Sequence, residues 1–220
     1  MSPVGTTAGK VDFNLYLITD RNSTAGSPLV SVVRQALDGG VRAIQLREKD
    51  LNGRELFALA KGLRNITSEY GARLIINERL DIAMAVEADG VHLGAASLPV
   101  AEARRLLGKN RLIGYSAHSA EEACQAEAAG ADFMTLGPVY FTPSKSEYGA
   151  PLGIGKLAEV TAMVSIPVFA IGGVKNSSIP ETMAAGAAGI AVISAIIGTN
   201  DPKGAAISLL KTMEQHVTNT

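Results

Sequence analysis

Three cations in this sequence follow short apolar segments and have the chemistry to bind an anion. Arg47 and Lys49 come directly after the apolar run 42–46, and Lys145 comes after the run 132–136. Arginine and lysine bind phosphate and diphosphate through charge-assisted hydrogen bonds, which are stronger than neutral ones. If the ends of these runs lie together in the fold, the three side chains form one anion-binding region.

A second anion-binding region is predicted from two other segments. Gly172 and Gly173 follow the run 166–171, and Ser194 ends the run 189–194. Bare amides at glycines, together with a hydroxyl near a helix start, are a common phosphate site in α/β barrels. Two separate regions indicate two phosphorylated ligands, or one ligand with phosphate at both ends.

Other polar residues stand near the ends of apolar runs or follow them. They are Gln45, Glu48, Asn77, Glu78, Ser97, Ser116, His118, Thr142 and Ser144. Each alone has an ordinary structural explanation, since Asn77 is typical of a turn and Ser97 fits the N-cap of a helix starting near Leu98. Because chance would not place all of them at or after the ends of apolar runs, we interpret the set as one site.

The elements that position these residues are predicted from periodicity. Short, nearly continuous apolar runs occupy residues 15–19, 42–46, 73–77, 89–93, 111–115, 132–136, 166–171 and 189–194. Continuous apolarity indicates parallel strands that are buried on both faces. About eight such runs, alternating with helical segments, predict a single-domain (β/α)8 TIM barrel with its active site at the carboxyl ends of the strands. An open doubly wound sheet has the same alternation and is the alternative.

Helical patterns fill the intervals between the runs. One apolar stripe at helical spacing comprises Leu29, Val32, Val33, Ala36 and Leu37. Two pairs, Ser119 with Glu122 and Ser178 with Glu181, match the capping box, in which a hydroxyl and a carboxylate satisfy free amides at a helix start. These patterns predict a helix start at each pair.

The composition restricts the classes of function. The 220 residues include 20 Lys and Arg against 21 Asp and Glu, so the net charge of −1 gives no reason to expect a nucleic acid or an anionic membrane as partner. A single cysteine, Cys124, excludes an intrachain disulfide and a cysteine-only zinc site.

The domain organisation is expected to be simple. No signal-peptide pattern and no apolar run of the ~20 residues that span a bilayer are found, so a cytoplasmic protein is expected. We expect a flexible tail over residues 1–12 and one catalytic barrel over residues 13–220, with homo-oligomer formation left open.

Seven stretches together give a resemblance to a known family. They cover residues 45–50, 76–83, 88–94, 114–119, 130–145, 170–174 and 191–196. On these stretches the chain resembles the thiamine phosphate synthases. They join 4-amino-2-methyl-5-(diphosphooxymethyl)pyrimidine to 4-methyl-5-(2-phosphooxyethyl)thiazole and release diphosphate with the help of Mg²⁺. The resemblance therefore implies two small-molecule substrates and a Mg²⁺ cofactor.

The resemblance also implies roles for particular residues. The pyrimidine diphosphate would bind at Gln45, Leu46, Arg47, Glu48, Lys49, Asn77, Ser116 and Lys145. The thiazole phosphate would bind at Thr142, Pro143, Ser144, Gly172, Ile193 and Ser194. The residues implied to be catalytic are Arg47, Lys49, Ser116 and Lys145.

The sequence departs from the family pattern at the implied metal site. Glu78 and Ser97 stand where the pattern has aspartates. Mg²⁺ is held by one or two carboxylates together with substrate phosphates, so the loss of one carboxylate predicts a weakened site. Two alternatives remain open. One is a thiazole tautomerase, which resembles the synthase and uses a histidine at the place of His118 for proton transfer. The other is a non-catalytic barrel that binds thiamine precursors.

Overall fold

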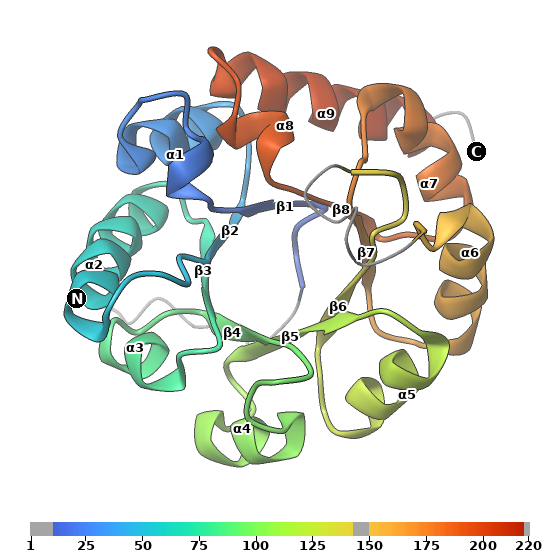
Figure 1. Cartoon of the computed structure of the whole chain (residues 1–220), viewed down its shortest axis with the longest axis horizontal. Coiled ribbons are helices and arrows are strands. Elements are labelled where there is room, and N and C mark those ends of the chain that lie inside the picture. Colours follow the sequence, from blue (N-terminus) through green and yellow to red (C-terminus); the bar gives the residue numbers. More distant parts are fainter. Residues whose placement is uncertain (1–10, 143–149, 218–220) are drawn as a thin grey trace, which may run out of the picture.

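The computed structural model describes residues 11–142 and 150–217, and within them eight parallel strands close into a barrel (Figure 1). The strands are β1 (Leu15–Ile18), β2 (Ala43–Leu46), β3 (Arg73–Asn77), β4 (Gly90–Leu93), β5 (Leu112–Ala117), β6 (Phe133–Leu136), β7 (Val168–Ile171) and β8 (Gly189–Val192). They pair in sequence order, and the pairing of β1 with β8, which sets Leu17 beside Val192, closes the sheet. The predicted (β/α)8 barrel is confirmed, and the open-sheet alternative is wrong.

Helices surround the barrel, as Figure 1 shows. They are α1 (Leu29–Asp38), α2 (Gly53–Glu69), α3 (Leu80–Ala85), α4 (Val100–Leu107), α5 (Ala120–Ala128), α6 (Gly153–Met163), α7 (Ile179–Ala184), α8 (Ser194–Ile197) and α9 (Pro202–Val217), with 3-10 turns η1 (Arg21–Ser23) and η3 (Asn176–Ser178). The predicted apolar stripe lies on α1, where all of its residues are buried. Among the described residues, no helix is long and apolar enough to cross a membrane.

Two layers of apolar packing hold the barrel. The outer layer lies between strands and helices and includes Leu15 and Leu17 of β1. The inner layer comprises Tyr16, Ile18, Ala43, Ile75, Leu112, Phe133, Phe169 and Ala191. Because these residues come from strands all around the barrel and still contact one another, they fill its interior. Residues of β1 alternate between the layers, as the pleat of a strand requires.

Phe13 covers the amino end of this interior. Its ring stacks on the ring of Phe169 with 5.2 Å between centroids and meets the ring of Phe133 edge-on at 5.6 Å. Beside it, the Asp12 carboxylate accepts a hydrogen bond from the Arg73 guanidinium at 2.8 Å. The described end of the segment expected as a tail therefore contacts the barrel, and residues 1–10 lie outside the described residues.

Of the two predicted capping boxes, one forms in part and the other is wrong. The Ser119 hydroxyl accepts a hydrogen bond from the Glu122 amide at 3.1 Å, but the Glu122 carboxylate accepts from the amide of His118 instead of that of Ser119. The Ser178 hydroxyl accepts from the Lys175 amide at 3.0 Å, and α7 begins without a side-chain cap. The turn η3 runs directly into α7, and the first amide of the helix, that of Ile179, donates to the Asn176 carbonyl of the turn.

Candidate active site

A cavity of about 790 Å³ opens at the carboxyl ends of the strands. Its described walls come from β1, β2, β3, β5, β6, β7 and β8 and from the loops after all of these strands except β3. The predicted site residues that it brings together are Gln45, Arg47, Asn77, Ser116, His118, Thr142, Gly172, Gly173, Ile193 and Ser194. A cavity of this size falls within the range that takes small-molecule ligands.

Other predicted site residues lie outside the described cavity wall. The Leu46 side chain packs in the outer layer, because neighbours in a strand point to opposite faces and Gln45 takes the inner one. A ligand contact from Leu46 would therefore use its backbone. Lys49 is exposed on the loop after β2, and Glu48 is buried in the same loop. The predicted residues Pro143, Ser144 and Lys145 lie outside the described residues.

Two charged residues that the sequence analysis missed also line the cavity. Asp20 follows β1, and Lys175 follows β7. The Asp20 carboxylate accepts hydrogen bonds from the Asn22 amide at 3.1 Å and the Ser23 hydroxyl at 2.6 Å, so it also caps η1. Both are polar residues shortly after a strand, so the signal that found the other site residues was present for them as well.

A buried histidine holds the polar floor of the cavity. This residue is His92. Its Nε2 atom lies 3.0 Å from the Ser116 hydroxyl and 3.4 Å from the Thr135 hydroxyl, and its Nδ1 atom lies 3.4 Å from the Tyr16 hydroxyl. Burial inside the barrel, helped by the nearby charge of Arg47, lowers the pKa of His92 to about 3. The imidazole is therefore neutral near pH 7, with one ring nitrogen donating and the other accepting.

The two glycines after β7 are required by their backbone and by their neighbours. Gly172 and Gly173 have φ angles of 91° and 67°, a region that other residues rarely adopt. A Cβ atom on Gly173 would lie 2.4 Å from the Phe141 carbonyl oxygen, and one on Gly172 would lie 2.6 Å from the Cβ atom of Pro138. The loop after β6 therefore packs directly on the glycines. Ser194, the first residue of α8, lines the same cavity.

His118 lies at the exposed rim of the cavity. Its side chain is 54% exposed, and its Nδ1 atom lies 3.4 Å from the Glu122 carboxylate. The same carboxylate accepts a hydrogen bond from the His118 amide at 2.8 Å. Helix α5 thus fixes the main chain of the histidine, and the ring stays open to solvent. Its role in proton transfer remains a prediction.

The two residues predicted to bind the metal offer a single carboxylate. Glu78 is exposed directly after β3, and its amide donates to the His92 carbonyl at 3.0 Å. The Ser97 hydroxyl accepts from the Gly94 amide at 2.8 Å and does not cap α4, which begins at Val100. Within residues 11–142 and 150–217, no group of three or more His, Cys, Asp or Glu side chains is placed to hold a metal ion.

Comparisons with known proteins agree with this arrangement. The family model described as thiamine monophosphate synthase matches residues 15–196, from β1 into α8. A putative thiamine-phosphate synthase of Geobacter sulfurreducens is 58% identical over 201 residues, which make up 91% of this chain and 94% of that protein. This chain belongs to the thiamine monophosphate synthase family. Another similar protein, the thiamine-phosphate synthase of Clostridium novyi, is 42% identical over 90% of this chain and 98% of its own length.

A solved structure supports membership of the thiamine monophosphate synthase family. Thiamine phosphate pyrophosphorylase from Pyrococcus furiosus matches with a TM-score of 0.85 at 40% identity, and the match covers 93% of this chain and 97% of that protein. All described residues that line the cavity, from Ile18 to Ala195, fall within the segment that the family model matches. The cavity is therefore built from the segment that the family model matches.

Proposed function

We infer that this family member is a thiamine-phosphate synthase, which joins 4-amino-2-methyl-5-(diphosphooxymethyl)pyrimidine to 4-methyl-5-(2-phosphooxyethyl)thiazole and releases diphosphate. The observation that carries the inference is one cavity with two regions suited to anions. Arg47 lies after β2, whereas Gly172, Gly173 and Ser194 lie after β7 and β8. Relatives that carry the synthase name, at 58% and 42% identity, support the same activity.

In this proposal the cavity stabilises a leaving group and aligns two substrates. The bond between the pyrimidine methylene carbon and the diphosphate oxygen breaks, and the thiazole nitrogen forms a bond to the same carbon. Arg47, Lys49 and Lys145 stabilise the negative charge that grows on the departing oxygen, and Ser116 adds a hydrogen bond. The loops after β7 and β8 bind the thiazole phosphate and so hold the ring nitrogen in line for attack.

Mg²⁺ belongs to the same proposal. When bound, it would neutralise charge on the diphosphate. Glu78, exposed directly after β3, would provide a carboxylate. Ser97, whose hydroxyl accepts from the Gly94 amide after β4, would provide a neutral oxygen, and the ion would take its other oxygens from diphosphate and water. We therefore expect this protein to need more Mg²⁺ than a site with two carboxylates needs.

Ser97→Asp should lower the Mg²⁺ concentration for half-maximal coupling by roughly tenfold, the factor that corresponds to about 1.4 kcal/mol. The new carboxylate gives a hard divalent cation a second charged oxygen, and it can still accept the hydrogen bond from Gly94. Without Mg²⁺ the same change should slow coupling, because the carboxylate repels diphosphate. The measurement is initial rate against Mg²⁺ concentration, with the neutral Ser97→Asn as control. Superimposed curves for the two variants would remove position 97 from the metal site.

The place of His118 favours a second candidate function. An exposed imidazole at the cavity rim suits proton transfer in a thiazole tautomerase, because an imidazole can both donate and accept a proton. The synthase reaction gives such a residue no necessary task, since the thiazole nitrogen attacks with its own lone pair.

Coupling and tautomerase assays on wild type and His118→Ala separate the two functions. A synthase should retain most of its coupling activity after the substitution, which is the result that we expect. A tautomerase should lose about 10²–10⁴-fold, the usual contribution of a general acid–base group. Wild-type protein that binds both phosphorylated compounds in calorimetry but converts neither would instead be a non-catalytic binder.

A further inference from the structure

The buried carboxylate of Glu48 is directed at other groups of the protein. Its side chain is 2% exposed. It accepts hydrogen bonds from the Thr19 hydroxyl at 2.7 Å, from the Arg21 amide at 3.1 Å with each oxygen, and from the Arg21 guanidinium at 3.3 Å. A buried carboxylate needs such donors to replace the water it has lost. Both oxygens of Glu48 are therefore engaged within the protein, and it is not among the described residues that line the cavity.

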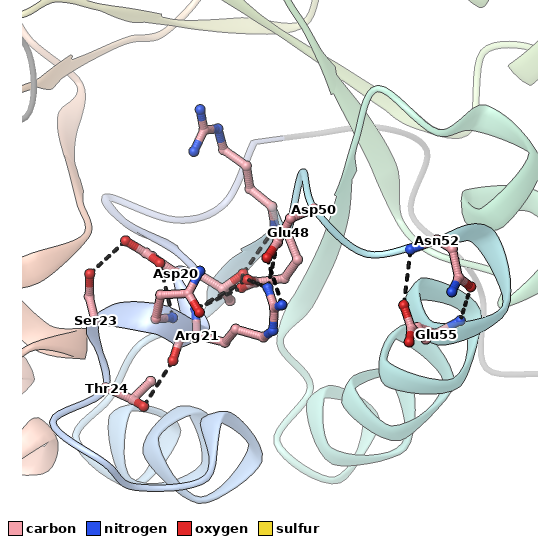
Figure 2. Close-up of polar contacts among 11 residues, drawn as sticks. Asp20, Arg21, Ser23, Thr24, Glu48, Asp50, Asn52 and Glu55 are labelled. Atoms are coloured by element: carbon pink, nitrogen blue, oxygen red, sulfur yellow. Dashed lines mark hydrogen bonds and ion pairs between the residues drawn. The ribbon is translucent and has the colours of Figure 1, made fainter.

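These contacts join two loops at the mouth of the barrel. Thr19 and Arg21 follow β1, whereas Glu48 and Asp50 follow β2, and Figure 2 shows Arg21 lying between the two carboxylates. The Arg21 Nη2 atom donates to Asp50 Oδ2 at 2.7 Å. The hydrogen bond from Arg21 lowers the pKa of Asp50 to about 2, so both ends of this contact stay charged near neutral pH. We refer to Thr19, Arg21, Glu48 and Asp50 as the loop clamp.

The Thr19 hydroxyl connects the loop clamp to Arg47. This fully buried hydroxyl donates to the Glu48 carboxylate and accepts from the Arg47 amide at 3.0 Å. A single side chain of the first loop thus fixes the backbone of Arg47 and the side chain of Glu48 in the second loop.

Each side of the loop clamp carries a residue of the cavity wall. Asp20 stands between Thr19 and Arg21 in the chain, and Arg47 directly precedes Glu48. Fixing the backbone on both sides limits the directions that these two side chains can take. We propose that Glu48 is a positioning residue, which acts through the loop clamp to hold Arg47 toward the diphosphate-bearing substrate and does not itself touch that substrate. The proposal rests on the proposed function.

Charge supports positioning over direct binding. A carboxylate facing a diphosphate would repel it, and the repulsion grows where water is excluded. The donors from Thr19 and Arg21 instead compensate the charge of Glu48 inside the protein. The loop clamp thus explains why an acidic residue stands between the two cations Arg47 and Lys49.

Two substitutions break the loop clamp in different ways, and two matched substitutions leave it intact. Glu48→Gln removes the charge, and Thr19→Val removes the bridging hydroxyl while keeping the shape of the side chain. Thr19→Ser keeps the hydroxyl. Glu55→Gln alters a carboxylate outside the loop clamp, one that accepts from the Asn52 amide at 3.1 Å at the start of α2 (Figure 2).

The readouts are the affinity for inorganic diphosphate by calorimetry, the KM of each substrate, and the Tm. Glu48→Gln and Thr19→Val should each weaken diphosphate binding and raise the KM of the pyrimidine substrate by roughly tenfold, with the KM of the thiazole phosphate within about twofold of wild type. Thr19→Ser and Glu55→Gln should bind diphosphate as the wild type does, whatever their Tm.

Several results would overturn the proposal. Weaker diphosphate binding in Glu48→Gln with normal binding in Thr19→Val would mean that Glu48 does not act through the Thr19 hydroxyl, and so not through the loop clamp. Weaker binding of both substrates in step with a fall in Tm would make it a structural residue only. If Glu48→Gln does not fold, the pair Thr19→Val and Thr19→Ser decides. Because diphosphate binding needs no turnover, a wild type that binds it without coupling contradicts the proposed function alone, and one that does not bind it contradicts both.

Discussion

Arg47→Met should lower kcat/KM for coupling by about 10²–10³-fold, the loss typical of removing one group that stabilises developing negative charge. Among the described residues that line the cavity, Arg47 is the only arginine. The Thr19 hydroxyl of the loop clamp accepts a hydrogen bond from its backbone amide. Methionine retains an unbranched apolar side chain, so the substitution removes the cation and keeps most of the packing. The loss should therefore be electrostatic, and the Tm should change little.

The experiment measures kcat and KM with each substrate varied in turn. Arg47→Met should lower kcat and raise the KM of the pyrimidine diphosphate, and the KM of the thiazole phosphate should stay near its wild-type value. Arg47→Lys should restore part of the rate, because lysine keeps a point charge but loses the two-pronged guanidinium. Arg54→Met removes an exposed arginine of α2 and should leave kcat/KM within about twofold, as surface substitutions usually do. Equal rates for Arg47→Met and Arg54→Met would place Arg47 outside the diphosphate site.

The strands could be predicted because each is buried on both faces. In a closed barrel one face of a strand meets the interior and the other meets the helices, so β2 has no exposed residue and reads as a continuous apolar run. The predicted run 73–77 coincides with β3. The run 166–171 begins earlier than β7, which starts at Val168, because the apolar residues before a strand continue the same pattern.

Position at or after the end of a strand predicted many residues of the described cavity wall, but it did not predict where each side chain points. Among the predicted site residues, Leu46, Glu48, Lys49, Glu78 and Ser97 do not line the cavity. Gln45 faces inward and donates to the Asn77 amide oxygen at 3.3 Å, whereas its neighbour Leu46 faces the helices. Arg47 and Glu48 diverge in the same way, one toward the cavity and one toward Thr19. Loops have no periodicity to read, and a hydrogen bond between distant loops leaves no local signal in the sequence.

His92→Asn should remove the acid sensitivity that this histidine gives to the fold. Burial lowers the pKa of His92 in the folded protein to about 3, whereas a histidine in an unfolded chain has a pKa of about 6.5. Between these two pH values the unfolded chain binds a proton that the folded protein excludes. The free energy of unfolding should therefore fall as the pH falls through this window, by about 1.4 kcal/mol per pH unit from this group.

The surroundings of the ring explain why the folded protein excludes the proton. The hydrogen-bond partners of His92 are the hydroxyls of Tyr16, Ser116 and Thr135, which carry no negative charge to stabilise an imidazolium. Burial also raises the pKa of the Tyr16 phenol, so this hydroxyl stays neutral. Gly114 leaves no room beside the ring, since a Cβ atom there would lie 2.4 Å from Nδ1. The ring is therefore closely packed on its Nδ1 side and almost fully removed from solvent, so a charge on it would gain little hydration.

Urea unfolding of wild type and His92→Asn from about pH 8 to about pH 4 tests this expectation. The variant should be less stable at pH 8, because Ser116 and Tyr16 lose a partner. The quantity that decides is the difference in unfolding free energy between wild type and His92→Asn. It should be constant above about pH 7 and narrow by about 1.4 kcal/mol per pH unit below about pH 6.5.

Thr135→Val is the control, because it alters the same contacts and keeps the histidine. The difference in unfolding free energy between wild type and Thr135→Val should therefore stay constant with pH. A constant difference for His92→Asn as well would mean that the folded ring titrates as freely as an exposed one. Ser116 would then lose its neutral partner as the pH falls through the histidine range, and its hydrogen bond at the cavity floor would have to be fixed by other groups.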